Sequence, residues 1–123
     1  MKRILIVDDA ATVRLYHRKL LESAGHAVDE AINGLEALER ALAAPYDLYV
    51  VDVNMPRMDG YSFLSALRGE DVPQAPAMMV STEAADHDRA RALICGANLY
   101  IVKPARPADL LTHVSLLLGE PCC

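Results

Sequence analysis

The residues in this sequence that could do chemistry come directly after short apolar runs. They are three carboxylates, two hydroxyls and one amine: Asp8, Asp9, Asp52, Ser81, Thr82 and Lys103. Carboxylate oxygens are the ligands that hard divalent cations prefer, and amine and hydroxyl groups donate hydrogen bonds to phosphoryl oxygens. If the fold brings these side chains together, the sequence predicts a site for a metal ion and a phosphoryl group.

The charges of such a site demand a cation. Two carboxylates about 4 Å apart repel each other by roughly 4 kcal/mol at an effective dielectric constant near 20. Ligands that are all oxygen, and few in number, favour Mg²⁺. With Lys103 as a second positive centre the site would suit a phosphoryl group, and a carboxylate is an established phosphoryl acceptor.

The elements that must position these residues alternate regularly along the chain. Five apolar runs predict β-strands: Ile4–Val7, Ala27–Ala31, Asp47–Val51, Ala77–Val80 and Leu99–Val102. A segment of helical period follows each strand. Strict alternation with buried-type strands predicts an α/β fold, a doubly wound parallel sheet with helices on both faces. In such sheets the ligand site lies beyond the carboxyl ends of the strands.

Several residues mark where the helices begin and which side they bury. Asn33 and Asp59 are expected to cap the second and third helices, and Pro107 suits the first position of the last one. In the first helix Val13, Tyr16, Leu20 and Leu21 recur at helical spacing, and the second helix has Leu35, Leu38 and Leu42 on one apolar face.

Length, composition and charge limit the classes of function. The 123 residues suit one domain, and 53% hydrophobic with 24% charged residues is ordinary for a folded protein. A net charge of −5 argues against independent binding of nucleic acid. No apolar run is long enough for membrane insertion, and no signal peptide is evident, so we expect a cytoplasmic protein without a disulfide framework.

The motifs at the strand ends resemble those of a known family. They are Ile-Val-Asp8-Asp9, Asp52-Val-Asn-Met-Pro56 with Met58-Asp59-Gly60, Ser81-Thr82, and Tyr100-Ile-Val-Lys103-Pro104. Their order and spacing resemble the receiver domain of two-component response regulators over essentially the whole chain. Within that family the sequence is most similar to stand-alone, chemotaxis-type (CheY-like) regulators. The resemblance implies a flavodoxin-like (βα)5 fold with strand order 2-1-3-4-5.

The resemblance also implies roles for the acidic residues and their surroundings. Asp52 matches the aspartate that accepts the phosphoryl group. Asp9 matches the carboxylate that binds Mg²⁺ directly, Asp8 one that acts through water, and the backbone carbonyl of Asn54 a further ligand.

Three further positions match residues that respond to phosphorylation. Ser81 matches the hydroxyl that binds the phosphoryl oxygens, and Lys103 the amine that pairs with them. The Lys103–Pro104 bond is expected to be cis. Tyr100 matches an aromatic switch that turns inward when Ser81 moves, which alters the surface of the fourth helix, fifth strand and fifth helix.

Asn54 and Glu83 bear on the lifetime of the phosphorylated form. They lie two residues after Asp52 and Ser81, and neither is large and apolar. Chemotaxis-type regulators, which the sequence resembles, carry Asn and Glu at these positions and lose their phosphoryl group quickly, because water can reach it. The resemblance therefore implies a lifetime of seconds to minutes.

The implied function is that of a single-domain response regulator. Residues 1–119 would form the receiver domain, and 120–123 a short tail with Cys122 and Cys123, without an output domain. A sensor histidine kinase would donate the phosphoryl group, and a downstream protein, such as a flagellar switch protein, would bind the altered surface. The protein would be a monomer or a weak phosphorylation-dependent dimer. It would be no conventional enzyme, although it would catalyse its own phosphorylation and dephosphorylation.

Other functions stay open at this point. A phosphorelay intermediate or a cell-cycle regulator would share the same fold and site. A Mg²⁺-dependent phosphohydrolase usually needs a second aspartate where Asn54 stands, and a cap domain. A flavodoxin-like FMN binder needs a loop rich in glycine and hydroxyls, whereas Asp8 and Asp9 would repel a phosphate.

Some positions depart from the family pattern or predict little. Thr12 or Asp9 would have to cap the first helix, and Ala105 stands where an aromatic residue is common, which would remove a bulky group from the partner-binding face. Arg57 and Arg106 fit plain surface residues, with a role in docking a phosphohistidine partner as the alternative. We expect Cys95 to be buried and all four histidines, His17, His26, His87 and His113, to lie on the surface.

Overall fold

Five strands and five helices alternate along the part of the chain that the computed structural model describes, residues 2–83 and 85–119. In chain order they are β1 (Arg3–Val7), α1 (Ala11–Ser23), β2 (Ala27–Ala31), α2 (Gly34–Ala43), β3 (Leu48–Asp52), α3 (Gly60–Arg68), β4 (Ala77–Ser81), α4 (Asp86–Cys95), β5 (Leu99–Val102) and α5 (Pro107–Leu118). The predicted tail with Cys122 and Cys123 lies outside the described residues. Within them, no helix has both the length and the apolar character of a membrane span.

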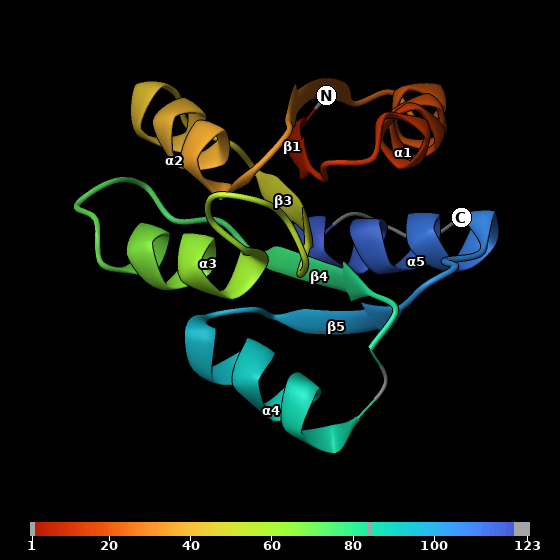
Figure 1. The fold of residues 1–123 in the computed structure, drawn as a ribbon. Helices are drawn as coiled ribbons and strands as arrows, with labels where there is room; N and C mark the ends of the chain where they lie inside the picture. Colours follow the sequence, from red (N-terminus) through yellow and green to blue (C-terminus); the bar gives the residue numbers. More distant parts are fainter. Residues whose placement is uncertain (1, 84, 120–123) are drawn as a thin grey trace.

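The strands form one parallel sheet in the order β2-β1-β3-β4-β5, as predicted. The sheet lies between two layers of helices (Figure 1). Side chains of α2, α3 and α4 pack on one face and those of α1 and α5 on the other. Order 2-1-3-4-5 reverses direction between β1 and β3, and this is where ligands bind in doubly wound folds.

The three central strands are buried on both faces, which explains their unbroken apolar sequences. Along β1, Ile4 and Ile6 face the layer of α1 and α5, whereas Leu5 and Val7 face the layer of α2, α3 and α4. All five residues of β3 and of β4 are buried as well. Buried strands of this kind fix the ends of the sheet, so that the residues at those ends have little freedom to shift.

Two of the three predicted helix starts rest on side-chain caps. The Asn33 side-chain oxygen accepts the Glu36 N–H at 2.9 Å, and Asp59 accepts the Ser62 N–H at 2.8 Å. Pro107 is the first residue of α5, as expected. The predicted cap of α1 was wrong: Ala10 holds the capping position and no side chain bonds to the free N–H groups there.

The apolar face predicted for α2 was also wrong. Leu35 and Leu42 are 42% and 45% exposed, and the helix instead buries Ala37 and Ala41, with Leu38 packed at the edge of the core. The alanines lie four residues apart, on the same side of the helix. Their small side chains let α2 lie close to the sheet, and the two leucines are left at its sides.

Two histidines that we expected on the surface are buried. His17 is 4% exposed and lies one turn before Leu21 on the core side of α1, where burial lowers its pKa. His26 is 9% exposed, in the tight turn between α1 and β2, where its N–H donates to the Leu21 carbonyl. His87 is exposed and His113 half-buried, and Cys95 is half-buried at the edge of the core.

Gly60 begins α3 in a place that has no room for a side chain. Its N–H donates to the Val53 carbonyl at 2.9 Å, which draws the start of the helix against the end of β3. A Cβ atom on Gly60 would overlap the Asp52 carbonyl oxygen and would lie 2.7 Å from the Met79 methyl group. The glycine therefore sets the distance between α3 and the strand that ends at Asp52.

We predict that Gly60→Ala lowers the free energy of unfolding by about 1–3 kcal/mol, because the added methyl group overpacks against backbone. Gly69→Ala is the matched control, since a Cβ there would make only ordinary contacts, the nearest at 3.6 Å. Urea denaturation of both variants measures the difference. Equal stability of the two variants would contradict this account of Gly60.

Candidate functional site

Four strands deliver the predicted polar residues to the carboxyl edge of the sheet. Asp8 follows β1 directly and Lys103 follows β5, whereas Asp52 and Ser81 are the last residues of β3 and β4. The sequence had placed Asp52 and Ser81 just beyond their strands; strand pairing of Asp52 with Val80 and of Ser81 with Val102 extends both strands by one residue.

An acidic cluster forms at this edge, as predicted. Carboxylate oxygens of Asp8, Asp9 and Asp52 all lie within 4.8 Å of one another. Asp8 and Asp52 are 3% and 9% exposed, whereas Asp9 is exposed to solvent. Burial of two carboxylates side by side is unfavourable unless positive charge lies close by.

Lys103 supplies that positive charge. Its amine donates to Asp8 Oδ2 and to Asp52 Oδ1, at 3.0 Å in each case. Its side chain is only 19% exposed, so both ion pairs are partly shielded from water. The Lys103–Pro104 peptide bond that follows is cis, in agreement with the resemblance.

The pKa values of this ion-pair cluster reflect burial and charge together. Burial raises the pKa of Asp52 above its usual 3.8; the bond from Lys103 opposes this, and the nearby charges of Asp8 and Asp9 add to it. Burial by itself would lower the pKa of Lys103, but the hydrogen bonds to Asp52 and Asp8 outweigh it, and the pKa is raised.

The two neighbouring aspartates of the cluster differ in how firmly they are held. Asp8 Oδ1 accepts the Ala10 N–H at 2.9 Å, in addition to the bond between its Oδ2 and Lys103. Among the described residues none bonds to the Asp9 carboxylate. Asp8 is therefore already satisfied by protein groups, and Asp9 has both oxygens free for another partner.

The residues present fit a hard divalent cation. Three carboxylates and one ammonium leave an excess of two negative charges, and every donor atom in the cluster is oxygen. Small numbers of carboxylate ligands suit Mg²⁺, which keeps several of its waters. The partly exposed position of Asp9 would leave room for those waters.

Ser81, Glu83 and Tyr100 are connected through backbone atoms. The Ser81 hydroxyl, which is fully buried, accepts the Glu83 N–H at 3.1 Å. The Tyr100 hydroxyl donates to the Glu83 carbonyl at 2.7 Å, and its ring is 7% exposed. The sequence analysis considered only the side chain of Glu83. The contacts of its backbone with Ser81 and Tyr100 were not predicted, because any residue type can make a backbone contact.

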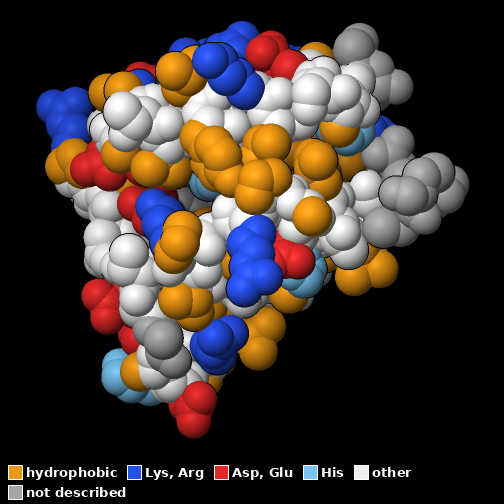
Figure 2. All heavy atoms as spheres, turned by 90° about the vertical axis from the view of Figure 1, so that its right-hand side faces the viewer, with side chains coloured by type: hydrophobic (Ala, Val, Ile, Leu, Met, Phe, Trp, Pro, Cys, Tyr) orange, Lys and Arg blue, Asp and Glu red, His pale blue; other side chains and the backbone are white. Residues whose placement is uncertain are grey.

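A small cavity adjoins the acidic cluster on the side of α1. Its volume is about 130 Å³, and it is lined by Val13, Tyr16, His17, Lys103, Pro104 and Ala105. Figure 2 views the molecule from the side toward which β4 and β5 point in Figure 1, and hydrophobic side chains gather across the middle of this face.

Ala105, where the sequence predicts the loss of a bulky group from the surface, is buried and lines the small cavity together with Tyr16. It is 8% exposed, and its carbonyl accepts the Tyr16 hydroxyl at 3.2 Å. An aromatic ring from α1 thus lies beside the position where the family often has one on the β5–α5 connection. The pairing was missed because the two residues are 89 positions apart in the sequence.

Comparison with known proteins identifies the family to which this arrangement belongs. The sequence model of the response regulator receiver domain matches residues 4–115. The chain belongs to the response regulator receiver domain family. Its acidic cluster and paired lysine therefore lie at the carboxyl edge of the sheet of a receiver domain.

Relatives of this receiver domain are parts of larger proteins. The chain is 40% identical over 114 residues to the sensor protein EvgS of Escherichia coli K12, and 36% identical over 116 residues to the transcriptional regulatory protein ResD of Bacillus subtilis. Each match covers over nine-tenths of this chain, but only 9% and 48% of the relatives' own lengths.

Solved receiver domains show the same fold. The chemotaxis protein CheY4 of Vibrio cholerae has a TM-score of 0.90 and 34% identity, covering 95% of this chain and 98% of that one. A CheY-like receiver domain protein from Methanospirillum hungatei has a TM-score of 0.90 and 31% identity, covering 97% and 94%. The solved relatives thus include both a chemotaxis protein and a receiver described only as CheY-like.

The raised pKa of Asp52 predicts a dependence of stability on pH. Because the pKa of Asp52 is higher in the folded state than in the unfolded state, protonation of Asp52 stabilises the folded state. This contribution is complete below the unfolded pKa, near 3.8, and is lost as the pH rises through the higher folded pKa. We predict that without divalent ions Asp52→Asn gains stability relative to the native protein as the pH rises through this range.

Thermal unfolding in a chelator across this pH range measures the gain. Asp71→Asn, at an exposed residue outside the cluster, is the control and should show no comparable trend. A stability difference for Asp52→Asn that stays constant, or shrinks as the pH rises, would contradict the prediction.

Proposed function

We propose that this receiver domain accepts a phosphoryl group on Asp52 from a phosphohistidine of a sensor histidine kinase. The bond between phosphorus and the histidine nitrogen breaks, and a bond between phosphorus and an Asp52 oxygen forms. The reaction would take place in the cytoplasm, where the kinase obtains its ATP. The protein itself would serve as a switch and not as a conventional enzyme.

The observation that carries this proposal is the position of Lys103 between Asp8 and Asp52. Its amine holds Asp52 Oδ1, and no described residue bonds to Oδ2. Oδ2 is therefore free to attack. As the phosphoryl group arrives, the amine can turn from the carboxylate to a phosphoryl oxygen while it keeps its bond to Asp8, so the charge stays paired throughout.

Mg²⁺ is the cofactor that the proposal requires. Asp9, Asp52 and the backbone carbonyl of Asn54 would hold it, and Asp8 would act on it through water. The ion, when bound, neutralises charge on the transferring phosphoryl group and orients it. The free carboxylate of Asp9 and the hard oxygen donors of the cluster support this assignment.

The response would start at Ser81. Its hydroxyl would turn from the Glu83 N–H toward a phosphoryl oxygen, which would release one of the two backbone bonds that hold Glu83. Because Tyr100 donates to the carbonyl of the same residue, its packing should change with Ser81. The surface of α4, β5 and α5 would then favour a downstream protein, with a coupling free energy of about 1–3 kcal/mol.

Chemotaxis is the process that we favour, with a flagellar switch protein as the downstream target. The nearly complete mutual coverage of this chain and CheY4, a chemotaxis protein, supports this choice. A phosphorelay intermediate or cell-cycle regulator is the second candidate, because EvgS, at 40% identity, is a sensor protein. A pull-down with the phosphorylated form would separate these outputs.

We predict that Asp52→Asn abolishes labelling by acetyl phosphate, because the amide cannot form the acyl phosphate. Labelling of the native protein should require Mg²⁺, and mass spectrometry measures it. Asp71→Asn, at an exposed residue outside the site, should be labelled like the native protein. Labelling of Asp52→Asn at a comparable rate would overturn the assignment of the phosphoacceptor.

We also predict that the phosphorylated form decays within seconds to minutes, and that Asn54→Met lengthens this lifetime severalfold. Asn54 and Glu83 are both exposed, so water can approach the phosphoryl group between them. Loss of the phosphoryl group over time, followed by mass spectrometry, measures the lifetime. Glu70→Met, a similar change at an exposed residue after α3, is the control.

A native phosphorylated form that is stable for many hours at neutral pH would contradict this account of lifetime. Equal decay of Asn54→Met and Glu70→Met would show that the side chain of residue 54 does not control access of water.

A further inference from the structure

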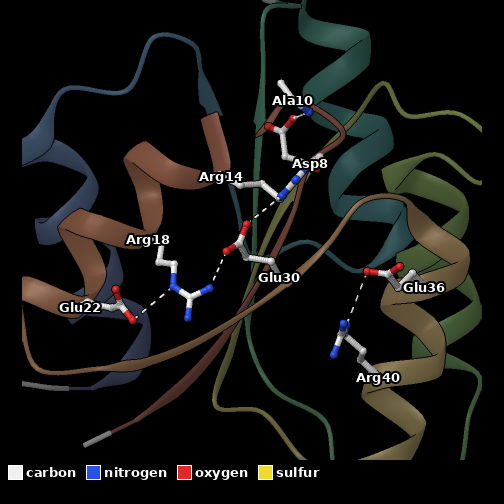
Figure 3. A network of polar contacts seen from close by, with 8 residues as sticks. All are labelled: Asp8, Ala10, Arg14, Arg18, Glu22, Glu30, Glu36 and Arg40. Atoms are coloured by element: carbon white, nitrogen blue, oxygen red, sulfur yellow. Dashed lines mark hydrogen bonds and ion pairs between the residues drawn. The ribbon is translucent and has the colours of Figure 1, made fainter. Parts of the chain in front are cut away.

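A network of charged side chains connects α1 with the ends of β1 and β2, behind the acidic cluster (Figure 3). In this network Arg14 links the residue after β1, Asp8, to Glu30 in β2. Its Nη1 donates to the Asp8 backbone carbonyl at 2.8 Å, and its Nε donates to Glu30 Oε1 at 2.8 Å. Glu30 also accepts a bond from Arg18, which lies one turn further along α1.

Both peptide groups that flank Asp9 are held by hydrogen bonds. The peptide between Asp8 and Asp9 is held through its carbonyl by Arg14, and the peptide between Asp9 and Ala10 is held through its N–H by Asp8 Oδ1. Peptide groups are planar, so fixing both of them fixes the Cα atom of Asp9 and the direction of its Cα–Cβ bond.

The direction of Asp9 depends on these backbone bonds, because no described residue holds its side chain. Among the described residues none bonds to its carboxylate, and the side chain is exposed. A free side chain on a loose turn would have to be ordered by the metal ion, at a loss of binding free energy. A side chain on a fixed turn is already directed toward the cluster.

We propose that Arg14 is a positioning residue for the divalent cation site, which acts by fixing the peptide that carries Asp9. The inference rests on the proposed function, because it takes Asp9 as the direct ligand. Arg14 suits this task because its guanidinium can donate to two partners in fixed directions. Its side chain is only 15% exposed, and Glu30 holds it in place.

The sign of the effect separates positioning from simple electrostatics. Arg14 is a cation close to a cation site, so removing its charge should strengthen Mg²⁺ binding if charge alone mattered. If Arg14 positions Asp9, removing it should weaken binding. Mutation of a residue that hydrogen-bonds a metal ligand typically lowers metal affinity by about 10–100-fold.

Arg14→Met should therefore weaken Mg²⁺ binding by roughly tenfold, a loss at the low end of that range. Methionine keeps a long, unbranched side chain that suits a helix. Arg18→Met is the matched control: it removes the same charge from the same helix and the same partner, Glu30, but does not touch the Asp8 carbonyl. Its Mg²⁺ affinity should stay within about twofold of the native value.

The variant Arg14→Lys tests whether a conservative replacement preserves part of the affinity for Mg²⁺. Lysine keeps the charge and one donor, but it cannot serve the Asp8 carbonyl and Glu30 in the same fixed geometry. Its affinity should fall between those of the native protein and Arg14→Met. If Arg14→Met does not fold, the comparison of Arg14→Lys with the native protein carries the test, and an unchanged affinity for Mg²⁺ would then overturn the inference.

Isothermal titration calorimetry with Mg²⁺ alone measures these affinities, since the chain has no tryptophan to report binding by fluorescence. Thermal unfolding without metal shows that each variant is folded. Unchanged or tighter binding by Arg14→Met would overturn the inference. Native protein that binds no Mg²⁺ would instead contradict the proposed function, so the two failures are distinguishable.

Discussion

The ion pairs of Lys103 are the interaction on which the rest of the site depends. One amine from the end of β5 reaches across the sheet to carboxylates at the ends of β1 and β3, at 3.0 Å each. Breaking a buried ion pair by removing one partner typically costs about 3–5 kcal/mol, because the other charge is left behind. The fold must therefore keep three strand ends in register, and the buried central strands between two helical layers do so.

Under the proposed function, the same ion pairs would let the site respond to a phosphoryl group. Phosphorylation would convert Asp52 into an acyl phosphate and add negative charge beyond it, so that the amine would gain a new partner in place of the old one. Ser81 stands at the end of the next strand, and its present partner, the Glu83 N–H, is a weaker, neutral one. Charge that arrives at one strand end can thus draw a hydroxyl at the neighbouring end.

Much of the fold and the site could be predicted from the sequence. Unbroken apolar runs marked the strands within one residue, and parallel topology then required Asp8, Asp52, Ser81 and Lys103 to meet at one edge. The faces of the helices were harder to predict. Ala37 and Ala41 of α2 face the core, and not Leu35 and Leu42, because a helix that lies close to the sheet favours small side chains. Apolar periodicity alone does not show which side of a helix meets the sheet.

Contacts made through backbone atoms lay beyond prediction for a different reason. Three such contacts use backbone atoms, which every residue has. They are the bond from Arg14 to the Asp8 carbonyl, the bonds of Ser81 and Tyr100 to the Glu83 backbone, and the bond from Tyr16 to the Ala105 carbonyl. In each contact, therefore, the residue type of the partner that uses its backbone gives no indication that the contact forms. Burial of His17 escaped prediction for another reason, because it depends on which side of α1 meets the sheet.

A crystal structure grown with Mg²⁺ and beryllium trifluoride, which mimics a phosphoryl group, tests the central claim most directly. The account predicts the trifluoride on an Asp52 oxygen, the Lys103 amine bonded to a fluoride and still to Asp8, and the metal ion on Asp9, Asp52 and the Asn54 carbonyl. A Lys103 amine that stays on Asp52, or a metal ion that does not touch Asp9, would contradict it.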